Sequence, residues 1–257
     1  MKSFVENLGS KTISAILYFG SFSVLSANSF RHIISSRKRG NLLKHINTIG
    51  VDSFPLIGII STFIGMILVM ETAYTLKKFG AEIYAGSIVT LSMIRELGPV
   101  FVAFVLAGRV GASIAAEIGS MKITEQIDAL KMLAVDPVEY LVSPRLLAGL
   151  ISLPSLFLIS LFLSIIGGFI VGVLIVGIPS GMFWYQSFRF ITFKDLFVGF
   201  IKSLVFALIV INAASYEGLK TEGGAVGVGK AATNSVVISF FLIILANLIL
   251  TGIFYFI

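Results

Sequence analysis

Two ionisable residues stand side by side inside an apolar stretch: Arg95 and Glu96 lie within Tyr84–Gly108, and Pro99 follows them. Arg95 is the twelfth residue of these 25, so a membrane-spanning helix here places it near the midplane. A charge at that depth costs at least ~2.5–3.5 kcal/mol unless it meets a partner or water. The pair therefore either holds helices together or forms a polar patch in a cavity that receives a charged headgroup. Arginine suits a phosphate because its planar guanidinium can donate two hydrogen bonds at once.

Two further charges, Glu71 and Lys202, stand alone near the outer side of other apolar stretches. Either side chain can extend toward the membrane surface. Glu71 has a second interpretation, in which it lines a cavity that opens outward. The candidate cavity residues are therefore Glu71, Arg95, Glu96 and Pro99.

A stripe of small residues follows the Arg–Glu pair at intervals of four: Ala107, Gly111, Ala115 and Gly119. Small side chains at this spacing let two helix backbones approach closely within lipid. The stripe predicts a tightly packed partner helix, either within the chain or across a dimer. A polar stripe runs beside it at the same spacing and consists of Arg109, Ser113 and Glu117.

The segment 121–134 has the pattern of a short amphipathic helix that ends before Pro137. Its apolar positions are Ile123, Ile127, Leu130 and Ala134, and its charged positions are Lys122, Glu125, Asp128 and Lys131. Because the charged face is mixed in sign, docking in a partner's groove is favoured over binding to anionic lipid.

A glycine-rich segment near the C-terminus imitates a phosphate-binding loop between Gly224 and Lys230. Ala231 stands where that motif requires serine or threonine for magnesium, so we interpret the segment 222–233 as a compact cap between two spans. The two histidines, His32 and His45, form no metal or serine-hydrolase motif. We therefore expect no enzymatic activity, no metal and no cofactor.

The composition explains where these residues must sit. Of the 257 residues, 57% are apolar and 12% charged, against about 45–50% and 25% in soluble domains, and there is no cysteine. This excludes an ordinary soluble domain, a disordered chain and a disulfide scaffold, and predicts an all-α multi-pass membrane protein. The five expected spans are Phe54–Leu76, Tyr84–Gly108, Leu146–Ile178, Leu196–Ala214 and Val236–Ile257.

The stretch Ile13–Phe30 is apolar but interrupted by serines, so it is a sixth span, a cleaved signal peptide or an interfacial helix. We favour the interfacial helix. With five spans, twelve lysines and arginines fall on the N-terminal side of the membrane and four on the other. The positive-inside tendency then makes the N-terminus cytoplasmic and the C-terminus external. Topology thus accounts for the net charge of +6, and no nucleic-acid partner is expected.

No tandem repeat or linker divides the chain. We expect one domain over residues 1–257, with an interfacial and cytoplasmic segment at 1–48 and a transmembrane bundle at 49–257.

Several of these motifs together resemble the MlaE permeases of bacterial ATP-binding-cassette lipid transporters. The matching segments, in order, are Arg95–Pro99, Ala107–Arg109, Ala116–Gly119, Thr124–Asp128, Val135–Pro137, Ser143–Arg145 and Gly224–Thr233. They span almost the whole chain, whereas the basic N-terminal region matches only loosely.

The resemblance implies a homodimer of five-span subunits in the inner membrane, each with an N-terminal interfacial helix and a short cytoplasmic coupling helix. Such a dimer works with a cytoplasmic ATPase, often with a small STAS-domain protein, and beneath a periplasmic ring of MCE proteins. It moves phospholipid between the inner and outer membranes and maintains outer-membrane asymmetry. On this resemblance Thr124, Glu125, Gln126 and Asp128 contact the ATPase, and Arg95 and Glu96 lie in or near the lipid cavity.

Two alternatives from other classes stay open at this point. An ion-coupled carrier would commonly show internal repeats and broken helices at the midplane, and only the Pro99 region suggests a break. A non-transporting scaffold for a lipid-binding complex would need Arg95 and Glu96 only for stability.

Overall fold

The computed structural model describes residues 20–32 and 41–256, and every regular element in these ranges is helical. Five of its helical segments are long and apolar enough to cross a membrane, which confirms the predicted all-α multi-pass architecture. The first comprises α2 (Leu42–Ile49) and α3 (Phe54–Lys77), and the second α4 (Ala85–Ser92), α5 (Gly98–Leu106) and α6 (Ala112–Ile123). The third contains α8 (Ser143–Val171), and the fourth and fifth are α10 (Phe193–Leu219) and α11 (Gly224–Phe256).

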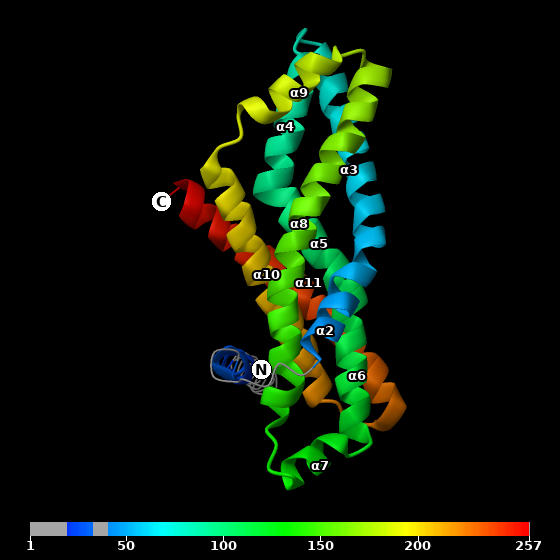
Figure 1. Cartoon of the computed structure of the whole chain (residues 1–257), viewed down its shortest axis with the longest axis vertical. Helices are drawn as coiled ribbons and strands as arrows, with labels where there is room; N and C mark the ends of the chain where they lie inside the picture. The colour runs from blue at the N-terminus through cyan, green and yellow to red at the C-terminus, as the bar shows by residue number, and fades with distance from the viewer. Residues whose placement is uncertain (1–19, 33–40, 257) are drawn as a thin grey trace, which may run out of the picture.

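Two short helices mark the two ends of the elongated bundle (Figure 1). Helix α7 (Gln126–Met132) lies at the end where α6 finishes, and α9 (Ser180–Arg189) lies at the opposite end, where it packs against α4. Helices α3 and α8 pack along each other, and α10 packs against α6, α8 and α11. By the predicted topology, the α7 end is cytoplasmic.

The second span is longer than the sequence indicated, running from Glu82 to Ile123 without leaving the helical path. Two π-helical segments interrupt it, at Met93–Leu97 and Ala107–Gly111. Its centre falls near Val102, so Arg95 lies about 10 Å from that centre toward the α9 end of the bundle, at 1.5 Å per residue. The prediction that this span ends at residue 108 was therefore wrong, because the helix continues through the small-residue stripe to Ile123. The position of Arg95 near the membrane midplane stays a prediction.

The predicted amphipathic helix at 121–134 is shorter than expected. Helix α6 continues to Ile123, a turn follows at Thr124 and Glu125, and α7 covers only Gln126–Met132. The turn forms because Glu125 adopts a left-handed conformation with φ of 60°, which ends one helix and begins the next.

The glycine-rich segment is not a compact cap. Only Gly223 and Gly224 adopt positive φ angles, and they make the turn that connects α10 to α11. Helix α11 begins at Gly224 and packs against α6 and α10. The remaining glycines are helical because this packing outweighs their weak helix propensity.

Residues 20–32 form a helix that contacts the α7 end of the bundle. The Ser143 hydroxyl donates a hydrogen bond to the Ser29 carbonyl at 3.3 Å, and a His32 ring nitrogen lies 3.3 Å from the Asp136 carboxylate. Phe22 meets Tyr216 of α10 edge to face. Residues 13–19 of the predicted interfacial helix lie outside the described part of the chain.

The close approach of α3 and α8 requires glycine at two positions. A Cβ atom on Gly65 would lie 1.9 Å from the Ser164 carbonyl oxygen, and one on Gly167 would lie 2.2 Å from the Thr62 carbonyl oxygen. Backbone atoms cannot yield as the end of a side chain can, so any larger residue must push the two helices apart.

We expect Gly65→Ala to lower the free energy of unfolding by about 1–3 kcal/mol, the usual cost of overpacking. Gly181→Ala in α9 is the matched control, since a Cβ there meets nothing within 4 Å. Thermal unfolding of both purified variants in detergent measures the difference. Equal midpoints for the two variants would contradict the close approach.

Candidate functional site

The Glu96 carboxylate forms an ion pair with a lysine from another span. The Lys202 ammonium of α10 lies 2.7 Å from Glu96 Oε2, and the Lys202 side chain is fully enclosed, with 0% exposure. The expectation that Lys202 extends to the membrane surface was therefore wrong. A charged side chain enclosed in protein needs a counter-charge. For Lys202 this is the Glu96 carboxylate, which lies in the first π-helical segment of the second span.

Helix α11 completes the shell around this ion pair. Asn247 Nδ2 donates to Glu96 Oε2, and the Thr251 hydroxyl donates to Glu96 Oε1, both at 2.8 Å. The Lys202 ammonium also donates to the Thr251 hydroxyl oxygen at 2.8 Å. We call Glu96, Lys202, Asn247 and Thr251 the buried charge cluster. It joins the second, fourth and fifth spans at one point.

Pro99 explains a further contact of the same ammonium. Proline has no N–H, so the helical hydrogen bond that residue 99 would make to the Arg95 carbonyl cannot form. The Lys202 ammonium donates to that carbonyl oxygen instead, at 2.8 Å. Pro99 itself is buried, so it shapes this contact and does not line an open surface.

A small residue lets α10 come close enough for these bonds. A Cβ on Gly199 would lie 2.6 Å from the Ile94 carbonyl oxygen, within the first π-helical segment. Because Gly199 precedes Lys202 by nearly one turn, the glycine sets the helix separation that the lysine then spans.

Arg95 forms a second ion pair, nearer the start of α10. Its Nε donates to Asp195 Oδ1 at 2.7 Å, and the Tyr255 hydroxyl donates to the same oxygen at 3.1 Å. Asp195 also caps α10, because its carboxylate and the Thr192 side chain exchange hydrogen bonds with each other's backbone amides. The Asp195 side chain is 1% exposed, whereas that of Arg95 is 40% exposed. Asp195 thus fixes the Arg95 guanidinium through Nε, and the other guanidinium N–H groups can donate to a second acceptor.

Glu71 does not belong to this group. Its side chain is exposed on α3, and its carbonyl accepts a hydrogen bond from the Thr75 hydroxyl within the same helix. Of the four candidate cavity residues, the structure brings together Arg95, Glu96 and Pro99. No sequence pattern pointed to Asp195, Asn247 or Thr251, and Lys202 was expected at the membrane surface; a lone lysine inside an apolar span was the one available signal.

The small-residue stripe faces α10 of the same chain. Ala107, Gly111, Ala115 and Gly119 are all buried. A Cβ on Gly111 would lie 3.6 Å from Val210, and one on Gly119 would lie 2.7 Å from the Thr221 hydroxyl. The tightly packed partner helix is therefore within the chain at these positions.

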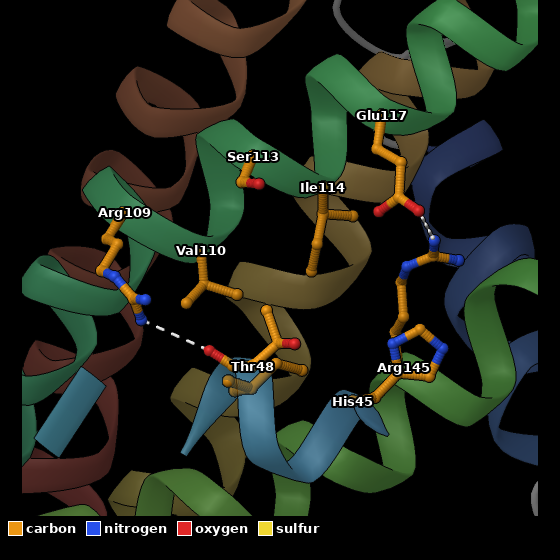
Figure 2. Close-up of a pocket in the computed structure, with 9 residues that line it drawn as sticks. His45, Thr48, Arg109, Val110, Ser113, Ile114, Glu117 and Arg145 are labelled. Carbon is orange, nitrogen blue, oxygen red and sulfur yellow. Dashed lines mark hydrogen bonds and ion pairs between the residues drawn. The ribbon is translucent and has the colours of Figure 1, made fainter. Parts of the chain in front are cut away.

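The parallel polar stripe lines a pocket on the α7 side of the membrane (Figure 2). Arg109, Ser113 and Glu117 of the second span meet His45 and Thr48 of α2 and Arg145 of α8 there. Glu117 forms an ion pair with Arg145 at 2.8 Å, as the dashed line in Figure 2 marks.

At the end of the bundle, α7 presents both polar and apolar groups. Thr124, Glu125 and Gln126 are exposed, whereas Ile127 is buried. Met132 and Leu133 are 87% and 74% exposed, although the predicted apolar positions did not include them. The expected register failed here because α7 ends at Met132 and a turn follows.

Asp128 of α7 pairs with Lys122 at the end of α6 and with Lys131 within α7 itself. Its carboxylate accepts from Lys131 at 2.9 Å and from Lys122 at 3.2 Å. These two hydrogen bonds, that of Lys131 first, hold the pKa of Asp128 below its ordinary value of 3.8. Because the pKa is lowered, the pairing of Asp128 with the two lysines is complete at any pH above the ordinary pKa of 3.8. It is lost only as the pH falls through the lowered pKa of the folded protein. The α6–α7 joint therefore keeps its charge pairing throughout the neutral range.

Breaking the buried charge cluster from one side should be costly. We expect Lys202→Met to lower the free energy of unfolding by about 3–5 kcal/mol, because it leaves Glu96 enclosed without its partner. The double variant Lys202→Met/Glu96→Gln should recover much of that loss. Denaturation in mixed micelles measures the free energy of unfolding of Lys202→Met, of Glu96→Gln and of the double variant. If the double variant is as unstable as the sum of its two single variants, the pairing does not stabilise the bundle.

Comparison with known proteins places this arrangement in a family. The family described as "Permease MlaE" matches residues 42–253. A "Probable ABC transporter permease protein" of Rickettsia bellii is 37% identical over 251 residues, which cover 97% of each chain. A protein of the same description from Synechocystis is 40% identical over 88% of this chain and 87% of its own. The "Intermembrane phospholipid transport system permease protein MlaE" of Haemophilus influenzae is 39% identical over 83% and 82%, respectively. The chain belongs to the MlaE permease family and is the permease subunit of an ABC-type transporter.

Proposed function

We propose that this permease moves phospholipid between the inner and outer membranes and thereby maintains the lipid asymmetry of the outer membrane. It would lie in the inner membrane with its N-terminus cytoplasmic and its C-terminus periplasmic. The proposed assembly is a homodimer with a cytoplasmic ABC ATPase, a periplasmic MCE-domain ring and a STAS-domain protein on the ATPase. The Haemophilus influenzae relative, named as an intermembrane phospholipid transport permease, supports phospholipid as the cargo.

The observation that carries the proposal is the half-open position of Arg95. Its buried partner Asp195 contacts Nε, and the side chain remains 40% exposed within a membrane span. A phosphate accepts charge-assisted hydrogen bonds from a guanidinium, often two at once. A cation that is fixed in place and still open to one side fits the capture of a lipid headgroup better than a role in packing alone.

The same helical span connects this residue to the proposed ATPase contact. From Arg95 the helix runs through α5 and α6 to the turn at Thr124, and α7 follows at the end of the molecule (Figure 1). Exposed Met132 and Leu133 supply apolar area for a groove, while Thr124, Glu125, Gln126 and Asp128 supply polar contacts. Closure of two ATPases would push on two copies of α7 and change the cavity between the two second spans.

The first test concerns the headgroup contact. In the transporter reconstituted with its ATPase into liposomes, Arg95→Gln should slow phospholipid transfer about tenfold or more, the usual range for a lost charged hydrogen bond. Lys194→Gln is the matched control, since it removes a positive charge beside the same Tyr255 ring without touching Asp195. Assembly with the ATPase should be unchanged in both. Normal transfer by Arg95→Gln would show that Arg95 does not bind the headgroup, and absence of transfer by the unmodified assembly would favour a scaffold.

The second test concerns coupling. Glu125→Lys reverses an exposed charge at the beginning of α7, so it should disconnect ATP hydrolysis from lipid transfer while the protein still folds. Glu222→Lys makes the same change at another exposed position, in the turn before α11. The ratio of phospholipid moved to ATP consumed should fall only in Glu125→Lys. A normal ratio in that variant would show that α7 does not couple the two.

A further inference from the structure

We propose that the pocket around Arg109 is a second binding site for a lipid phosphate, at the level of the cytoplasmic leaflet. This inference rests on the proposed phospholipid transport and adds a position to it. The shared chemistry is recognition of a phosphate by a guanidinium and hydroxyl groups.

Arg109 differs from the other cations within the spans. Lys202 and Arg145 each meet a carboxylate, as does Arg95. Arg109 Nη1 instead donates to the Ser53 hydroxyl at 2.5 Å and to the Thr48 carbonyl at 3.3 Å, and both acceptors are uncharged. Among the described residues no carboxylate forms an ion pair with Arg109. A cation at membrane depth without a counter-charge favours an anionic ligand.

The surroundings of Arg109 are suited to a small anion. The pocket has a volume of about 100 Å³, and the Thr48 and Ser113 side chains contribute hydroxyl groups to its wall (Figure 2). Arg145 and Glu117 cancel each other across the pocket, so the charge of Arg109 remains uncompensated. A pocket of this size can hold a small group such as a phosphate but not the acyl chains attached to it.

Two features of the backbone place the guanidinium there. Arg109 belongs to the second π-helical segment, Ala107–Gly111, and such insertions are frequent at functional sites. It lies about 10 Å to the cytoplasmic side of the centre of its span, where a long side chain can reach the headgroup boundary of a bilayer ~30 Å thick.

A lipid is favoured over free phosphate because apolar surface begins on another side of α2. Ile46 of α2 and Gly50, which follows this helix, line an apolar groove of about 260 Å³ with residues of α8, whereas His45 and Thr48 of α2 line the polar pocket. Phe54 is shared with a second apolar groove of about 330 Å³ along α3. A lipid held by its phosphate near α2 therefore has apolar surface close by for its chains.

Arg95 and Arg109 would then bind the lipid phosphate at two different levels of the second span. Arg95 and Arg109 are fourteen residues apart on the same helical span, or about 20 Å at 1.5 Å per residue.

Native mass spectrometry of the purified transporter, titrated with phosphatidylglycerol, tests this inference. Arg109→Gln removes the charge but keeps an amide donor for Thr48 and Ser53, so we expect it to weaken binding of one lipid per subunit about tenfold. Ser53→Ala is the matched control, because it removes the hydrogen bond and keeps the charge; it should leave that affinity unchanged. Diacylglycerol, which lacks the phosphate, should not occupy this site.

Other outcomes would contradict the site, its lipid ligand or the proposed function. Equal losses in Arg109→Gln and Ser53→Ala would mean that Arg109 only clamps α2, and no loss in either would remove the site. Occupancy by inorganic phosphate without phosphatidylglycerol would refute the lipid. If phosphatidylglycerol binding depends on Arg95 but not on Arg109, this inference alone fails. If phosphatidylglycerol does not bind to the unmodified transporter at all, the proposed function fails with it.

Discussion

The charge of Lys202 constrains more of this structure than any other group. Its ammonium is enclosed within a membrane-spanning helix, and such a charge persists only if a carboxylate and further acceptors meet it. Glu96 supplies the carboxylate, Thr251 a hydroxyl, and the Arg95 carbonyl is available because Pro99 cannot donate to it. Three spans are therefore tied together where the candidate headgroup residue stands. Arg95 acquires a defined position because its neighbour in sequence is immobilised.

The long second span connects the Arg95 region to the α7 end of the molecule. It continues from the Arg95 region to α6, whose small residues pack against α10, and ends at the joint that Asp128 clamps. At this joint the Lys122–Asp128 ion pair links the two helices, and it stays charged throughout the neutral range because the pKa of Asp128 is lowered. The two π-helical segments contain Arg95 and Arg109, respectively. Local changes of helical winding at these segments offer a way for motion at one end to alter a side chain at the other.

Much of the fold could be predicted from the sequence because lipid imposes simple rules. Apolar length identifies the five spans, and spacing of small residues identifies the helix face that packs closely. The pairing of Lys202 could not be predicted, since its partner lies 106 positions away and only tertiary structure brings the two together. Helix ends were also misjudged: the second span continues past residue 108 to Ile123, and α11 begins within the glycine-rich segment. In both cases packing against neighbouring helices overrides local propensity. The Arg95–Glu96 pair was found because adjacent charges in an apolar span are rare, whereas Asp195 lies at a span's edge, where charges are ordinary.

The central claim is that this chain acts as the lipid-binding permease of an ATP-driven assembly. The most direct measurement is mild-detergent purification of the tagged protein from its native membrane, followed by mass spectrometry of the proteins and lipids that accompany it. The account predicts an ABC ATPase and an MCE-domain protein, together with bound phospholipid. Recovery of the chain alone, with neither ATPase nor lipid after gentle solubilisation, would contradict it and favour an ion-coupled carrier.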